Sequence, residues 1–371
     1  RGPICAATQM AVGRPRTSWE RYHSLFARHD PSAENYRHNT THHAFYIVGV
    51  TITESVGRAT YLLTDHSRDQ RTLPVEVWFP LSQPGGEPMM YELLPNVGFY
   101  GTAVSGGTPP SDPLPVVIVS HGHMGTRLVY SQLCEALAAR GYFVVSPDHP
   151  GDTMADVLMG AGVDEVTNIE LRVDDLTFVY ESLIGDRDGF DHGCVIDPCR
   201  VHALGHSFGA YGIVEWSARG GTGAALASLV ALQPYLLPLT SSSLQSVATP
   251  LLIVAGDKDV TTPVATNVTP ALQHLPAEMT TAVVLTGVGH QGCSDVGLYI
   301  EMAPSIDGVP DFVIDFLATM SADTTGVAGE PWRPVTSAHI EIVSTWLETS
   351  GNLDATVSVA QRHGGRVITL P

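Results

Sequence analysis

Short apolar runs alternate with longer amphipathic segments from residue 115 onward, and this alternation is the strongest pattern in the sequence. Continuous apolar runs suit strands that are covered on both faces, as in a parallel sheet with helices on either side. Glycine, proline, aspartate or histidine bounds each run. The runs are PVVIVSHG, YFVVSPDH, VHALGH, LASLVALQ, PLLIVAGD and AVVLTGVGH. The pattern predicts an α/β fold with a mostly parallel central sheet.

Segments whose apolar residues recur at helical spacing lie between these runs and after them. They are found at 126–141 and 166–185, and again near the end of the chain at 309–320 and 336–351. The last segment has Thr and Ser at its start and glycine at its end, which are typical helix boundaries. Loops at the carboxyl ends of parallel strands are where ligand-binding and reacting groups are expected.

The first third of the chain follows a different pattern. Residues 1–43 mix Arg, His, Pro and Asn without a period, and we expect an irregular extension ahead of a single domain at 44–371. Three β-branched runs, FYIVGVTITES, ATYLLTD and TLPVEVWFP, predict an antiparallel set of strands. Residues 81–114 are rich in Gly and Pro and predict a long connection, which in a compact domain is often functional.

Composition excludes several classes of protein. The formal net charge is −19, which argues against a nucleic-acid or anionic-membrane partner because phosphate binding needs clustered Lys and Arg. No apolar run approaches the roughly 18 residues that a membrane span requires. The numbering opens at Arg1 rather than Met, so a targeting segment could already have been removed, and we expect a secreted or periplasmic protein. The oligomeric state stays open.

Histidine and cysteine positions give little support for a metal site. His38, His42 and His43 fit a solvated cluster better than a ligand set. The five cysteines include no CxxC pair, and we expect neither a metal nor a cofactor. Cys194 and Cys199 flank a proline and could form a small-loop disulfide or remain as two thiols.

The segment GHSFG places Ser207 between Gly205 and Gly209, directly after a predicted buried strand and before a predicted helix. In this context GxSxG indicates a nucleophile elbow, in which small flanking residues let strand and helix approach while the serine is held on a tight turn. A neighbouring residue, His206, is expected to brace the turn. The pattern predicts that Ser207 is a nucleophile.

A serine hydroxyl needs a histidine to take its proton and a carboxylate to orient that histidine. In this fold class the chain order is serine, acid, histidine. One downstream strand ends in Asp257 and Asp259, and the last one ends in His290 within a glycine-rich loop. We therefore expect His290 to be the base and one of the two aspartates to be its partner.

An oxyanion that develops on the substrate requires N–H donors. The residue after the nucleophile, Phe208, supplies one, and the loop SHGHMG supplies another through the main chain of His123. The His-Gly-His spacing of this loop could suggest a metal, but the loop serves acyl chemistry without one.

The chain resembles the α/β-hydrolase superfamily at five motifs. They are SHGHMG, GYFVVSPDHPGDT, GHSFGA, TPLLIVAGDKDVTTPVAT and GVGHQG. Within it, these motifs are similar to the dienelactone-hydrolase-like group, which includes platelet-activating-factor acetylhydrolases and bacterial cutinases or polyester hydrolases. The resemblance covers residues 44–320. It implies an α/β-hydrolase fold with an antiparallel N-terminal strand set.

The resemblance also bears on the acid. The acetylhydrolases place it one strand earlier, where this chain has Gln233, which cannot carry the charge. The cutinase-like pattern DxxxPV implies Asp259 instead. By the same resemblance Tyr235 stands where polyester hydrolases keep an aromatic wall of the acyl site. We expect Met124, Gln233 and Tyr235 to contact the substrate.

These features predict a serine carboxylic ester hydrolase for neutral short- to medium-chain esters, including polyester fragments. The alternatives are acyl transfer or amide cleavage by the same residues, hydrolysis of phospholipid-like acetyl esters, and a non-catalytic binding module. Phe208, Met124 and Tyr235 favour a neutral acyl group. Arg127 is expected to be solvated, although an inward-turned arginine could anchor a carboxylate.

Overall fold

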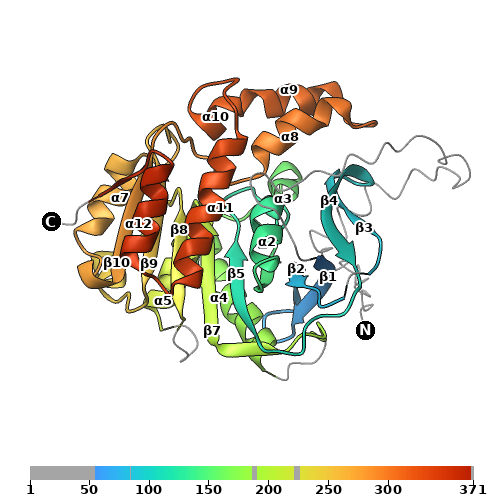
Figure 1. The fold of residues 1–371 in the computed structure, drawn as a ribbon, viewed down its shortest axis with the longest axis horizontal. Helices are drawn as coiled ribbons and strands as arrows, with labels where there is room; N and C mark the ends of the chain where they lie inside the picture. The colour runs from blue at the N-terminus through green and yellow to red at the C-terminus, as the bar shows by residue number, and fades with distance from the viewer. Residues whose placement is uncertain (1–54, 84, 186–189, 221–225, 369–371) are drawn as a thin grey trace, which may run out of the picture.

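The fold is centred on one large sheet with helices on both sides (Figure 1). The structure is a computed structural model that describes residues 55–83, 85–185, 190–220 and 226–368. Within these residues eleven strands form the sheet in the order β11-β10-β9-β8-β7-β5-β6-β2-β1-β4-β3. The strands are β1 (Val56–Asp65), β2 (Arg71–Pro80), β3 (Pro88–Leu94), β4 (Val97–Ser105), β5 (Leu114–Ser120), β6 (Phe143–Pro147), β7 (Ile196–His206), β8 (Ser228–Leu232), β9 (Leu251–Gly256), β10 (Thr280–Leu285) and β11 (Arg366–Val367).

The predicted parallel half of the sheet is confirmed. Strands β6, β5, β7, β8, β9 and β10 pair in parallel, in that spatial order. Strands β8, β9 and β10 are buried along their whole length. Their continuous apolar sequences therefore follow from burial on both faces.

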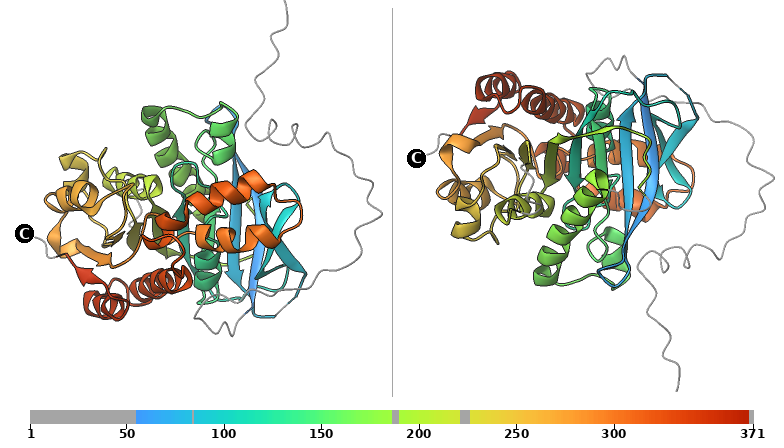
Figure 2. Two further views of the ribbon diagram at one scale, coloured as in Figure 1. Left: turned by 90° about the horizontal axis from the view of Figure 1, so that it is seen from above. Right: turned by 90° about the horizontal axis from the view of Figure 1, so that it is seen from below.

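Two layers of helices cover this sheet, as the views in Figure 2 show. One hydrophobic cluster packs α4 and α5 against one face, and a second packs α2 and α11 against the other. The helices are α2 (Ser131–Ala138), α3 (Met154–Leu158), α4 (Glu165–Ile184), α5 (Phe208–Ala218), α6 (Ser241–Gln245), α7 (Val264–Leu272), α8 (Val296–Met302), α9 (Asp311–Thr319), α10 (Ser321–Thr325), α11 (Arg333–Glu348) and α12 (Leu353–Arg362), with short 3-10 turns at Ala277–Met279 and Ala303–Ser305. None of the helices in the described part of the chain is both long and apolar enough to cross a bilayer.

The antiparallel N-terminal strand set is confirmed in part. Strands β1 and β2 pair antiparallel along their full length, and β2 joins the rest of the sheet through antiparallel pairing with β6. Two predicted segments lie outside the described residues. They are the extension at 1–43, with its three histidines, and the run FYIVGVTITES except for its last residue.

The prediction of a long loop at 81–114 is wrong. This segment contains β3 and β4, which form an antiparallel hairpin, and β4 also pairs in parallel with β1. The register of the hairpin shifts between Pro88 and Met90 and again between Glu92 and Leu94. Gly and Pro suggested a loop, but Tyr91, Phe99 and Ala103 alternate with more exposed residues and are buried in the core. Burial of this one face outweighs the local preference for turns.

A buried carboxylate on α2 fixes the hairpin to the domain. Glu135 accepts hydrogen bonds from the Tyr91 hydroxyl at 2.6 Å, from the Thr102 main chain at 3.1 Å and from the Thr102 hydroxyl. The Trp78 indole of β2 in turn donates to the Tyr91 hydroxyl at 2.7 Å. Because a buried carboxylate requires such partners, α2, β2 and the hairpin hold one another in place.

Candidate active site

Ser207 occupies a strained turn between β7 and α5. Its φ of 54° and ψ of −118° lie in a region that residues with a side chain seldom adopt. A Cβ added to Gly205 would lie 2.3 Å from the Gly209 oxygen, and one added to Gly209 would lie 2.0 Å from the Ser120 oxygen. Both flanking glycines are therefore required by the close approach of β7, α5 and the end of β5.

The structure brings Ser207, His290 and Asp259 into one hydrogen-bonded chain. His290 Nε2 lies 3.0 Å from Ser207 Oγ, and His290 Nδ1 lies 2.8 Å from Asp259 Oδ2. The loops after β9 and β10 carry the aspartate and the histidine, and all three side chains are buried. Asp257 instead accepts a hydrogen bond from the Gly287 N–H at 2.7 Å and is exposed.

Two threonines that the sequence analysis did not single out hold the Asp259 carboxylate. It accepts hydrogen bonds from the main-chain N–H groups of Thr261 at 2.9 Å and Thr262 at 2.7 Å, and from the Thr262 hydroxyl at 2.8 Å. Burial opposes ionisation of Asp259, but the bonds from His290 and Thr262 outweigh it and lower its pKa. The carboxylate is therefore ionised at neutral pH. The sequence signal was the run Asp-Val-Thr-Thr, which favours such a turn.

His206 braces the elbow rather than reacting. Its Nδ1 lies 2.8 Å from the Tyr130 hydroxyl, and its Nε2 lies 2.9 Å from the main-chain oxygen of His290. Burial, together with the nearby His290 ring, lowers the pKa of His206 to about 3. The ring is thus neutral, so that Nε2–H donates to the carbonyl and Nδ1 accepts from Tyr130. The Gly122 N–H also donates to Tyr130, at 3.2 Å.

The loop that carries His290 is held from a second side by α10 and the start of α2. The N–H groups of Gly289 and Gln291 donate to the carbonyls of Thr324 at 3.2 Å and Asp323 at 2.6 Å. These bonds fix the main chain on both sides of the histidine.

The loop after β5 and the first residue of α5 each carry an N–H group without a partner among the described residues. A Cβ added to Gly122 would lie 3.1 Å from the Ser207 Cβ, so the main chain passes close to the hydroxyl. Among the described residues, no group accepts a hydrogen bond from the N–H of His123 or of Phe208. Met124 follows with a φ of 59°, and its N–H donates to the Asp152 carbonyl at 3.1 Å. The loop is therefore a tight turn in which the His123 N–H is available to a ligand.

Tyr235 lies against the elbow. Its N–H donates to the Ser207 carbonyl at 3.0 Å, and its ring centroid lies 6.0 Å from that of Phe208. Its hydroxyl donates to Glu165 at 3.1 Å. Both Tyr235 and Met124 are partly exposed.

The structure corrects the expectation that Gln233 contacts substrate. The residue is fully buried, its side-chain amide nitrogen lies 2.9 Å from His339 Nε2, and its main-chain carbonyl oxygen lies 3.0 Å from the Thr262 hydroxyl. Its side chain is thus used within the core, behind the site.

The expectation that Arg127 is solvated is also wrong. Its guanidinium donates to Asp148 at 2.6 Å and to Glu76 at 3.3 Å, and its side chain is only 16% exposed. The two carboxylates balance the charge of this arginine and occupy its Nε and Nη1.

Cys194 and Cys199 are free thiols. In the described ranges, no group of three His, Cys, Asp or Glu side chains is arranged to hold a metal ion.

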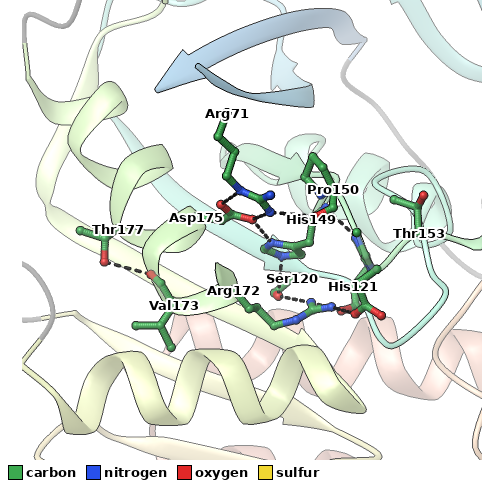
Figure 3. A network of polar contacts seen from close by, with 12 residues as sticks. Arg71, Ser120, His121, His149, Pro150, Thr153, Arg172, Val173, Asp175 and Thr177 are labelled. Carbon is green, nitrogen blue, oxygen red and sulfur yellow. Dashed lines mark hydrogen bonds and ion pairs between the residues drawn. The ribbon is translucent and has the colours of Figure 1, made fainter. Parts of the chain in front are cut away.

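A buried polar network that leaves no pattern in the sequence lies beneath the loop after β5 (Figure 3). His149 Nε2 lies 3.0 Å from Ser120 Oγ, and His149 Nδ1 lies 3.1 Å from Asp175 Oδ2. Arg71 binds the Asp175 carboxylate with two nitrogens, each at 2.7 Å. Arg172 joins Ser120 to Asp152 and to the main chain of the loop. Helical spacing at 166–185 predicted α4 but gave no sign that its polar residues face inward.

Comparison with known proteins finds relatives for parts of the sequence. A family model for platelet-activating factor acetylhydrolase, isoform II, matches residues 97–159. The "Probable 1-alkyl-2-acetylglycerophosphocholine esterase" of Arthroderma benhamiae is 28% identical over 29% of this chain and 29% of its own length. Cutinase 1 of Thermobifida cellulosilytica is 26% identical over 47% of this chain and 59% of its own. The matched segments thus span less than two thirds of these relatives.

A solved structure extends the likeness to most of the fold. The ferulic acid esterase from Streptomyces cinnamoneus superimposes with a TM-score of 0.64 at 20% identity, covering 81% of this chain and 91% of that one. The sheet order and this structural likeness show that the chain has an α/β-hydrolase fold. In sequence, parts of the chain are similar to proteins named as acetylhydrolases, esterases and cutinases.

We predict that the free energy of unfolding falls as the pH drops below about 6.5. Burial lowers the pKa of His149 to about 4 and that of His206 to about 3, so the unfolded chain takes up protons that the native state rejects. Each such histidine adds a slope of up to about 1.4 kcal/mol per pH unit between these values. Urea unfolding at pH 7.5 to 4.5 measures it.

His206→Gln should flatten this slope, whereas His66→Gln, at an exposed ring, should leave it unchanged. A free energy of unfolding that stays constant between pH 6.5 and 4.5 would contradict the assignment of buried neutral histidines.

Proposed function

We propose that the protein is a serine carboxylic ester hydrolase. The observation that carries the proposal is the unbroken hydrogen-bonded chain from Ser207 through His290 to Asp259, next to the unpaired N–H groups of His123 and Phe208. This arrangement fits acyl transfer through a covalent intermediate. The names of the similar proteins, which are esterase, cutinase and acetylhydrolase, support the same reaction class.

In the first half-reaction Ser207 Oγ attacks the ester carbonyl while its proton passes to His290 Nε2. The carbonyl oxygen becomes an oxyanion that accepts hydrogen bonds from the His123 and Phe208 N–H groups. The intermediate collapses, the C–O bond to the alcohol breaks, and His290 gives its proton to the leaving alcohol. An acyl group then remains on Ser207.

In the second half-reaction His290 takes a proton from water, and the resulting hydroxide attacks the acyl carbon. Collapse of the second intermediate returns the proton to Ser207 Oγ and releases the carboxylic acid. Asp259 accepts a hydrogen bond from the Nδ1–H of His290 throughout, which keeps Nε2 directed at the serine and stabilises the imidazolium.

The site supports neutral acyl groups as substrates. Phe208 belongs to the elbow, Tyr235 packs near it, Met124 lies in the loop after β5, and Arg127 is paired with two carboxylates. A substrate carboxylate would therefore lose water without gaining a cationic partner. We propose short- to medium-chain neutral esters, including polyester fragments. Secretion or a periplasmic location stays a prediction.

Replacing Ser207 by Ala should abolish ester turnover and labelling by a fluorophosphonate, because the hydroxyl forms the covalent bond. The loss in kcat should be on the order of 10⁶. Circular dichroism and the thermal midpoint check that the fold survives. Substantial residual turnover, or labelling that persists in Ser207→Ala, would contradict the proposal.

The two neighbouring aspartates provide a matched pair for testing the acid. Asp259→Asn should lower kcat by about 10⁴, because the amide favours the wrong tautomer of His290. Asp257→Asn removes a carboxylate two residues away that binds only the Gly287 main chain, and we expect a change within a few-fold. Equal losses in the two variants would refute the assignment of Asp259.

Charge selectivity tests the substrate class. We expect kcat/KM for a neutral p-nitrophenyl ester to exceed that for a carboxylate-bearing ester of the same length by roughly tenfold or more. Lengthening the neutral acyl chain should raise kcat/KM by up to about fourfold per methylene until the pocket is filled, from about 0.8 kcal/mol each. A preference for the anionic ester would show that the pocket contains a cation that this assignment omits.

A further inference from the structure

We infer that Arg172 of α4 is a positioning residue that sets the geometry of both halves of the oxyanion hole. The inference rests on the proposed function, since it assigns a role in the reaction proposed for Ser207. Arg172 touches neither the serine nor the histidine of the site. It contacts the two segments that carry the His123 and Phe208 N–H groups.

On the first side, Arg172 holds the loop after β5. Its Nη1 donates to the His121 carbonyl at 2.5 Å and to Ser120 Oγ at 3.0 Å, and Nη2 binds the Asp152 carboxylate. These contacts fix the main chain immediately before His123 (Figure 3). The direction of the His123 N–H therefore depends on the guanidinium.

Asp152 extends this hold to the rest of the loop. Its second carboxylate oxygen binds the His123 ring, and its main-chain oxygen accepts from the Met124 N–H at 3.1 Å. Burial opposes ionisation of Asp152, but the Arg172 charge lowers its pKa, so the pair is charged at neutral pH. The ion pair thus contacts the loop at Ser120, His121, His123 and Met124.

On the second side, Arg172 packs against the elbow. Its Cζ lies 5.0 Å from the centroid of the Phe208 ring, within range of a cation–π contact. Helix α5 leaves space for it at Gly212, where an added Cβ would lie 2.8 Å from Arg172 Cδ and 3.0 Å from Cγ. Gly212 lies in a helix, where glycine has an unfavourable propensity, and the passage of the arginine accounts for it.

A role in stability alone does not account for this arginine well. The side chain is fully buried, and its Nε has no hydrogen-bond partner among the described residues. Burying an ion pair is often no better for stability than a well-packed apolar pair, and an unpaired donor adds a further cost. What the planar guanidinium supplies is a rigid fork that joins three groups at fixed angles.

The surrounding network keeps the arginine from moving. Ser120 Oγ, which accepts from Arg172, also contacts His149, and His149 is bonded in turn to Asp175. The main-chain N–H of His149 donates a hydrogen bond to His121 Nε2 at 3.0 Å. Oxyanion donors that are fixed before substrate arrives need no rearrangement during the reaction.

Steady-state kinetics on a neutral p-nitrophenyl ester tests the inference with Arg172→Lys and Arg172→Met. Misplacing oxyanion donors should lower kcat by about 10² to 10³ and leave KM within a few-fold. Affinity for a trifluoromethyl ketone, which forms a tetrahedral adduct, should fall in parallel with kcat, whereas the midpoint of the pH–rate profile should stay. Arg219→Met, at a partly exposed arginine paired with Glu170 and Glu215, is the matched control and should retain kcat.

Arg172→Met could fail to fold because it leaves the buried Asp152 carboxylate unpaired. Two further variants keep the test decisive in that case. Gly212→Ala retains both charges but pushes the arginine aside, and Arg172→Met with Asp152→Asn removes both together. Folded Gly212→Ala protein with wild-type kcat and ketone affinity would overturn the inference. Wild-type protein without ester turnover, or Ser207→Ala with full turnover, would instead refute the proposed function itself.

Discussion

The close approach of Gly209 to the Ser120 carbonyl is the constraint on which the rest of the site depends. At this point α5, β7 and the end of β5 meet with no space for a Cβ. The contact forces Ser207 into a positive φ and sets the distance between the elbow and the loop that carries His123. Strain of this kind persists only because the buried strands on both sides hold the backbone in place.

Charge is balanced locally beneath the site. Arg172 pairs with Asp152, and Arg71 pairs with Asp175, while burial keeps His121, His149 and His206 neutral by lowering the pKa of each. In the proposed reaction, an imidazolium on His290 would therefore meet the Asp259 carboxylate without competing positive rings. A rigid set of paired charges and neutral dipoles provides a field that need not reorganise when charge moves.

The sequence predicted the parts of the structure that leave a local pattern. Buried parallel strands appear as apolar runs, and the elbow appears as glycines spaced around Ser207, so both could be read without coordinates. The hairpin of β3 and β4 could not, because its alternation is short and its stability comes from the distant Glu135. Arg172 was missed for the same reason. An arginine in a helix normally faces solvent, and only the packing of α4 on α5 shows that this one faces inward.

The register shifts in β3 affect how the sheet meets its surroundings. Strand β3 forms one edge of the described sheet, and the other edge is β11, which is only two residues long. An edge strand with a regular backbone offers a row of unpaired N–H and C=O groups to which a strand of another molecule can bind. The proline at the start of β3 and its two irregularities break that row at one side, and the short length of β11 limits it at the other. Sheet extension from molecule to molecule is thereby disfavoured at both described edges, which leaves helices and loops as the surfaces through which two such domains would associate.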